Sequence, residues 1–189
     1  MSDAFQRGWG VVKMPIVPNS VRYEGKTTTP GRETEMNRYS ATFRDPEDDK
    51  LYPMRGFYGI EPEDGRRWLD VDIADEVNPK YKPGLGPSSE AKVFPASDRE
   101  QYEDIGDPDI PRAEYPPEPH EWIGHIEAYP ERRGRGTSMY DLVAMILQDQ
   151  RPGDRLFPHP AQSEEGSALW NNRWEWLPPD KDEVGEIQR

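Results

Sequence analysis

Proline is the residue that most restricts how this chain can fold. There are 21 prolines in 189 residues, and a dense series of them lies between residues 76 and 119. Proline cannot donate to a β-ladder and it stops helices, so we expect a long insertion at 76–119 that covers the surface or is partly disordered. The insertion is either a spacer or an arm that docks a partner. The aromatic anchors of such an arm would be Tyr81, Phe94, Tyr102 and Tyr115.

Composition limits both the size of the core and the class of partner. Apolar residues make up 33% and charged residues 32% of the chain, so we expect one domain with a modest core. The formal net charge of −13 disfavours a nucleic-acid binder, which needs a basic face, and it disfavours anionic membranes. The absence of cysteine excludes disulfides, thiolate zinc sites and cysteine nucleophiles. Neither a signal-peptide pattern nor a membrane-length apolar run occurs, so we expect a cytoplasmic protein.

The segment before the insertion divides into an arm and a group of strands. Apolar residues at helical spacing predict a short helix over residues 3–14, and an extended arm follows to residue 35. Turns are expected in the arm at Pro18–Asn19 and Pro30–Gly31. From Asn37 to residue 73 apolar and polar residues alternate, which predicts an antiparallel meander of about three strands. Pro53 suggests that the second of these strands is an edge strand or contains a bulge.

After the insertion the pattern predicts strand, glycine turn and helix. Residues 121–129, "EWIGHIEAY", alternate as a strand, and residues 137–149 follow with period 3.6. A short strand at "DRLFPH", a helix at "EEGSALWNNR" and a final strand at "WEWLPP" complete the pattern. We expect residues 179–189 to form a polar tail that frays.

The glycine turn combines bare backbone with positive charge at the start of a helix. Unpaired N–H groups and the helix dipole favour an anion at this position. Gly134 and Gly136 let the backbone approach a ligand, while Arg133 and Arg135 add charged donors, so we expect a pyrophosphate or similar anion here. The lysine of a P-loop is absent, and Met139 stands where a dinucleotide fingerprint needs its third glycine.

This stretch resembles the acetyl-CoA signature of the GNAT acyltransferase superfamily, R/Q-x-x-G-x-G/A after a strand. The residues that carry the resemblance are Arg133, Gly134, Arg135, Gly136 and Thr137, with Ser138 in place of the final glycine or alanine. The resemblance covers residues 120–178 and is compatible with the meander, but it includes neither the insertion nor the arm. It implies an α/β (α+β) domain at 36–178, with a mixed, mostly antiparallel sheet flanked by helices and its acyl-CoA-binding half at 120–178.

The resemblance also implies an activity, which is transfer of an acyl group from acetyl-CoA to an amine. The loop Arg133–Ser138 would hold the pyrophosphate, and the backbone of Ile126, Ala128 and Tyr129 would pair with the pantetheine arm. Glu127 and His125 are candidates for the general base, although both could equally be solvated strand positions.

The closing helix departs from the family pattern. Trp170 stands where a tyrosine acid is expected, and an indole cannot protonate the leaving thiolate. We expect Trp170, Trp174 and Trp176 to belong to the core. The histidines at 120, 125 and 159 are too scattered to predict a metal site.

Two further hypotheses therefore stand beside the enzyme. One is a non-catalytic binding or assembly protein on the same scaffold, which contacts a protein partner or a second copy through the arm and the insertion. The other concerns origin, since "FQRGWGVVKMPIVPNSV" is similar to the start of small phage-encoded acetyltransferase-like proteins, which would act in the host cytoplasm or the virion. If the acidic segments 45–49 and 98–109 face the acceptor, they favour a cationic amine.

Overall fold

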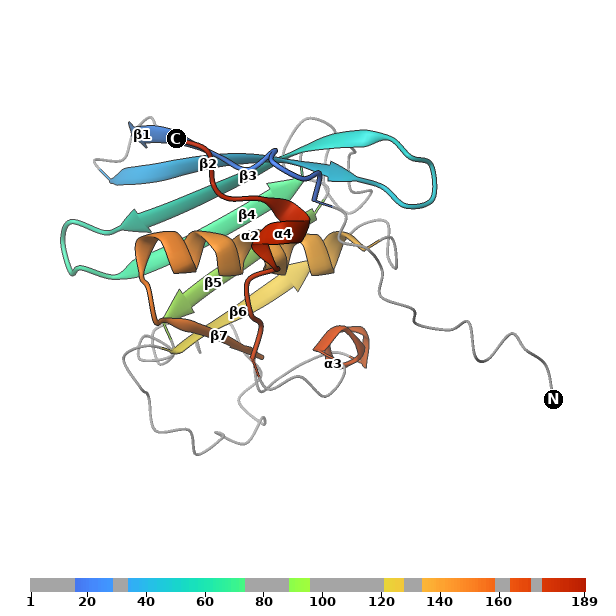
Figure 1. Ribbon diagram of the computed structural model, residues 1–189. Coiled ribbons are helices and arrows are strands. Elements are labelled where there is room, and N and C mark those ends of the chain that lie inside the picture. The colour runs from blue at the N-terminus through green and yellow to red at the C-terminus, as the bar shows by residue number, and fades with distance from the viewer. Residues whose placement is uncertain are drawn as a thin grey trace, which may run out of the picture.

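The computed structural model is built on one seven-stranded sheet, in which each strand lies beside the next one along the chain (Figure 1). It describes residues 16–28, 34–73, 89–95, 121–127, 134–158, 164–170 and 175–189. The strands are β1 (Arg22–Thr28), β2 (Glu35–Arg44), β3 (Leu51–Ile60), β4 (Arg67–Ile73), β5 (Ser89–Pro95), β6 (Glu121–Glu127) and β7 (Arg155–Pro158). Neighbouring strands are antiparallel from β1 to β6, whereas β6 and β7 are parallel.

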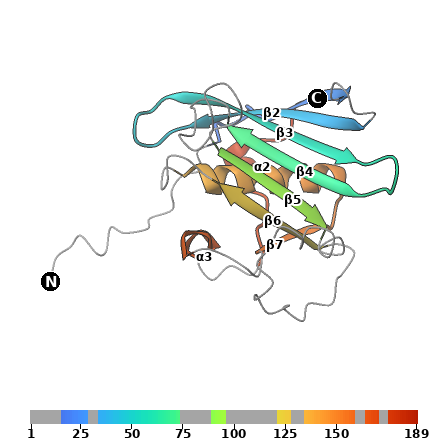
Figure 2. The same ribbon diagram turned by 180° about the vertical axis from the view of Figure 1, so that it is seen from behind.

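In the part of the chain that the structure describes, one long helix, α2 (Arg135–Gln150), covers one face of the sheet and lies between β6 and β7 in the sequence. The core lies between this helix and the strands. Its fully buried side chains include Tyr39, Phe43, Met54, Leu69, Met139, Leu142 and Ile146. Gly56 lets the helix approach β3, because a Cβ atom there would lie 2.4 Å from Cδ1 of Ile146. Figure 2 shows the opposite face, which is covered by no helix of the described part of the chain.

The expected mixed, mostly antiparallel sheet is confirmed. Strands β2, β3 and β4 are the meander predicted over 37–73, and β6 is the strand predicted at 121–129. The helix predicted at 137–149 is α2, which begins slightly earlier, at Arg135. Pro53 is not on an edge strand, since β3 lies between β2 and β4. The register between β2 and β3 passes through Pro53 without a bulge, and the described pairing of β4 with β3 begins at the next residue, Met54.

The prediction of an irregular insertion at 76–119 is wrong for residues 89–95. These residues form β5, which lies inside the sheet between β4 and β6. The reason is a short alternation that the surrounding prolines obscure: Ser89, Ala91 and Val93 are all buried on one side of the strand. Phe94 is 9% exposed and belongs to the same strand, so it is not a free anchor. The rest of the insertion lies outside the described residues.

The expected arm is likewise part of the sheet. Residues 22–28 form β1, which pairs with β2, and the rings of Tyr23 and Tyr39 lie 5.3 Å apart across the pair. Ile16 and Val21 are buried in the core ahead of this strand, which explains why the segment does not extend away from the domain. The predicted turn at 18–19 is present, and the predicted helix at 3–14 lies outside the described residues.

The C-terminal segment, residues 175–189, does not fray. It passes in front of α2 from β7 to β1, and includes the short helix α4 (Lys181–Val184) (Figure 1). At one end the amide of Trp176 donates to the Leu156 carbonyl at 2.8 Å; at the other, the Gln188 amide donates to the Val21 carbonyl at 2.9 Å. Val184 is 1% exposed. Buried apolar surface and paired backbone groups therefore order a segment whose polar composition predicts disorder.

Candidate functional site

The start of α2 has the features of an anion-binding helix terminus. Gly134 is the N-cap, with φ 74° and ψ 1°, a left-handed conformation that favours glycine. It provides no side-chain cap, and the first turn contains no acidic residue. Although the chain has a net charge of −13, no carboxylate in the first turn of α2 balances the positive end of the helix dipole. An anion could cap the first amides here.

Arg135, the described arginine of the turn, is part of a buried ion pair. Arg135 is fully buried, and its guanidinium forms an ion pair of 3.6 Å with Asp45, which is also fully buried. The guanidinium also lies 5.0 Å from the ring centre of Tyr52 and 5.7 Å from that of Phe43. The sequence predicts that Arg135 contacts an anionic ligand, whereas in the structure its side chain lies in the interior. Arg133 lies outside the described residues.

Gly136 is close to protein atoms on two sides. A Cβ atom at this position would lie 3.2 Å from Leu169 of helix α3 (Glu164–Trp170) and 3.5 Å from Ile126 of β6. The missing side chain thus allows α3 and β6 to approach the first turn of α2. Ser138 is buried, and its hydroxyl and amide both donate to the Gly134 carbonyl, at 2.9 and 3.1 Å. Thr137 remains partly exposed.

Strand β6 continues beyond its described pairing with β7, toward the start of α2 in the chain. Pairing with β7 runs from Glu121 to Gly124, where β7 ends, while β6 continues to Glu127. In this continuation Ile126 packs against the core. His125 and Glu127 pair with β5 through their backbone, but their side chains lie outside the described part of the structure, as do residues 128 and 129.

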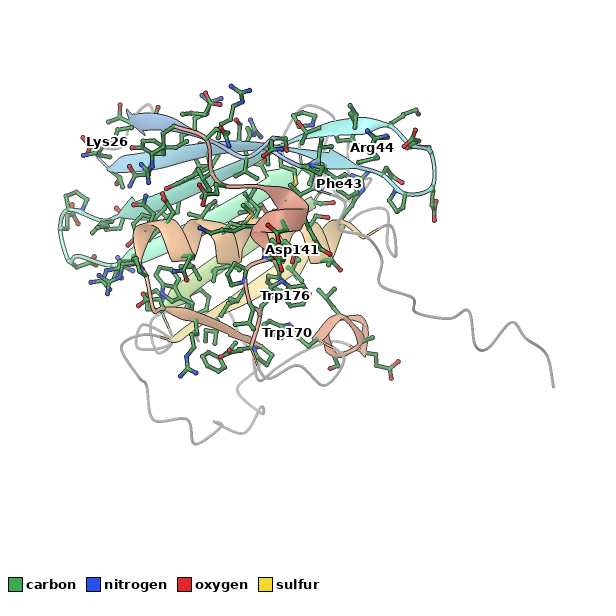
Figure 3. All side chains as sticks on the ribbon, in the orientation of Figure 1. Lys26, Phe43, Arg44, Asp141, Trp170 and Trp176 are labelled. Carbon is green, nitrogen blue, oxygen red and sulfur yellow. The ribbon has the colours of Figure 1, made fainter. Side chains whose placement is uncertain are left out.

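An aromatic cluster occupies the side of α2 that faces the C-terminal segment. The ring centres of Tyr140, Trp170 and Trp176 are 5.1–5.3 Å apart, and the Trp176 indole donates to Asp141 at 2.8 Å (Figure 3). Trp170 and Trp176 are 4% and 3% exposed, which confirms that they belong to the core; Trp174 lies outside the described residues. Tyr140 donates to the Gly124 carbonyl of β6 at 3.4 Å.

Burial raises the pKa of the Tyr140 hydroxyl to about 12, and burial followed by the hydrogen bond to Asp149 raises the pKa of Tyr39 as well. An unfolded tyrosine ionises near pH 10. We therefore expect the stability contributed by Tyr140 to be complete below about pH 10 and to fall between about pH 10 and pH 12, because only the unfolded state loses the proton there. Ultraviolet absorbance should show these two phenols still protonated in the folded protein near pH 11. Simultaneous ionisation of all nine tyrosines near pH 10 without unfolding would contradict this.

The acidic segment 45–49 is less available than its sequence suggests. Asp45 is buried, and two of its neighbours pair with cations of the same hairpin: Arg44 with Asp49 at 2.8 Å, and Lys50 with Asp48 at 3.5 Å. Attraction of a cationic acceptor by this segment is correspondingly reduced. Segment 98–109 lies outside the described residues.

Comparison of the chain with known proteins identifies no relative. No family model, curated protein or solved structure matches the chain. Across the described ranges, none of the helices is both long and apolar enough to cross a membrane. In the same ranges, no three histidine, aspartate or glutamate side chains are grouped so that they could hold a metal ion.

Proposed function

We propose that the protein binds acyl-CoA at the start of α2 and transfers the acyl group to an amine. The observation that carries the proposal is the α2 terminus without a side-chain cap, which follows β6, a strand whose described pairing with the parallel β7 reaches only Gly124. In the proposal β6 leaves β7 beyond this pairing, so that its backbone groups lie beside the helix terminus. The GNAT resemblance implies such a pair of separated strands.

In this proposal the pyrophosphate caps the first-turn amides of α2, next to Gly134. Arg133 supplies a charged donor, whereas Arg135 supports the turn from the interior through Asp45. The backbone of β6 from Ile126 onwards pairs with the pantetheine arm. In this proposal the Ser138 side chain does not contact the ligand, because it is buried and its hydroxyl donates to the Gly134 carbonyl.

The chemical step is attack of a neutral amine on the thioester carbonyl. The new C–N bond forms, the C–S bond breaks, and the proton of the amine passes to a general base, for which Glu127 and His125 are the candidates. The thiolate takes its proton from water in this mechanism, because Trp170 cannot donate one and Tyr140 is buried against Gly124.

A carboxylate placed in the first turn tests the anion site directly. Thr137→Glu should raise the free energy of unfolding by about 0.3–1 kcal/mol through the helix dipole, while it weakens acetyl-CoA binding at least tenfold (an order-of-magnitude estimate) by competing with the pyrophosphate. The matched control is Gln148→Glu, which makes the same charge change at an exposed position near the other end of α2. Calorimetry with acetyl-CoA and urea denaturation measure the two quantities.

The control should bind acetyl-CoA as the wild type does, and Arg133→Ala should bind it more weakly. Equal loss of affinity in Thr137→Glu and Gln148→Glu would mean that net charge, not the helix terminus, governs binding. If the wild-type protein does not bind acetyl-CoA at millimolar concentration, the acyltransferase proposal is wrong.

A non-catalytic binding protein is the second candidate, and one observation favours it. Arg135 and Gly136, two central residues of the glycine turn, both have a packing role, with Asp45 and Leu169 respectively. A scaffold could keep such a turn without a cofactor. Absence of acetyl-CoA binding, together with a folded wild-type protein, would favour this candidate and a search for a protein partner.

A further inference from the structure

The first residue of α2, Arg135, forms an ion pair with the hairpin that joins β2 to β3. Arg135 pairs with Asp45, and its guanidinium lies against Phe43 of β2 and Tyr52 of β3. We propose that Asp45 and Arg135 are positioning residues, which hold the first turn of α2 in the conformation that binds the anion. This inference rests on the proposed function for the identity of the ligand, but its structural half can be measured without one.

The turn needs the Asp45–Arg135 ion pair because glycines on both sides of Arg135 restrict its backbone conformation little. Arg135 is flanked by Gly134 and Gly136, and glycine loses more conformational freedom on folding than any other residue. The helix has no side-chain cap at this end. Its first backbone hydrogen bond, from the Ser138 amide to Gly134, is 3.1 Å long. The buried side chain of Arg135 is therefore a principal constraint on where the first amides point.

The other half of the pair is held rigidly by its own turn. The Asp45 amide donates to Lys50, and the Asp45 carbonyl accepts from Asp49, both at 2.9 Å. One oxygen of its carboxylate accepts the Glu47 amide at 2.9 Å, and the other lies 3.6 Å from Arg135. The hairpin thus presents a pre-oriented carboxylate to the helix, and the turn at 45–50 becomes part of the ligand site without touching the ligand.

The substitution Asp45→Asn separates positioning from simple charge, because the two predict opposite signs. Removal of a negative charge near an anion site should strengthen binding if Asp45 acts only through its electric field. Loss of the Asp45–Arg135 ion pair should weaken CoA binding if Asp45 positions the turn. We expect CoA to bind Asp45→Asn about tenfold more weakly than the wild type, and the Ser138 amide to exchange its hydrogen faster.

The experiment measures CoA binding by calorimetry and hydrogen exchange at residues 135–139 in the wild type, Asp45→Asn, Arg135→Lys and Arg151→Gln. Arg135→Lys keeps the charge but loses the planar group between the rings, so it should resemble Asp45→Asn and serves if that variant does not fold. Arg151→Gln is the matched control, since Arg151 pairs with the buried Asp154 at 3.2 Å at the other end of α2. It should change neither quantity at the first turn.

Each result decides one of the two proposals. Tighter CoA binding by Asp45→Asn, or exchange at Ser138 that both pair variants leave unchanged, would overturn the positioning role. Absence of CoA binding in the wild type would instead overturn the proposed ligand. Faster exchange in the two pair variants, with unchanged exchange in Arg151→Gln, would still establish that the hairpin orders the start of α2.

Discussion

Arg135→Met is expected to lower the free energy of unfolding by about 3–5 kcal/mol, which is the usual cost of leaving one member of a buried ion pair without its partner. Both side chains of the Asp45–Arg135 pair are completely buried, so water cannot solvate the remaining carboxylate in the native state. Urea denaturation followed by tryptophan fluorescence measures the change.

The double variant Asp45→Asn/Arg135→Met should recover most of that loss, since it leaves no charge buried. The two single variants and the double variant form a double-mutant cycle that isolates the interaction between the residues. If Arg135→Met unfolds within about 1 kcal/mol of the wild type, the pair is solvated rather than buried, as surface pairs are.

Trp122→Ala is expected to destabilise the protein by about 3–5 kcal/mol, the range found when a buried aromatic side chain is truncated. Trp122 is fully buried on β6, with its ring centre 6.1 Å from that of Tyr58. Its indole also donates to Asp154 at 2.9 Å and so joins β6 to the turn after α2. The same denaturation experiment applies.

Trp122→Phe separates packing from hydrogen bonding at this position. It keeps a six-membered aromatic ring but loses the five-membered ring and its bond to Asp154, which still pairs with Arg151, so we expect a cost of about 1–2 kcal/mol. An equal loss in the phenylalanine and alanine variants would show that the hydrogen bond dominates and would contradict the packing argument.

The elements that could be predicted from the sequence are those whose periodicity is uninterrupted. Alternation through Tyr39, Ala41 and Phe43 predicts β2, and the helical spacing from Met139 to Leu147 predicts α2. The glycine turn between β6 and α2 is predicted for the same reason, because glycines and polar residues separate two clear patterns. Local signals are sufficient for these parts.

The remaining elements depend on contacts between distant segments. β5 has only three alternating small or apolar positions among many prolines, and its order comes from β4 and β6 on either side. The C-terminal segment is mostly polar, and it is ordered by the buried side chains of Trp176 and Val184 and by backbone pairing with β1 and β7. Propensity is overridden by tertiary context in both cases.

The candidate site shows the same division. The start of the helix next to Gly134 could be predicted, but Asp45 as the partner of Arg135 could not, because an acidic turn residue usually predicts a solvated loop. One signal was present: Asp45 continues the alternation of Tyr39, Ala41 and Phe43, so the same parity places it on the buried side of β2.

The course of the C-terminal segment has a consequence for synthesis on the ribosome. The Tyr23 amide on β1 donates to the Gln188 carbonyl, so the earliest described strand is completed by a residue that is made long after it. N-terminal parts of a chain usually begin to fold as they emerge. Here β1 can pair with β2 early, but its hydrogen bonds with residue 188 form only after the C-terminal segment has been translated, so the last contacts of this edge of the sheet form late.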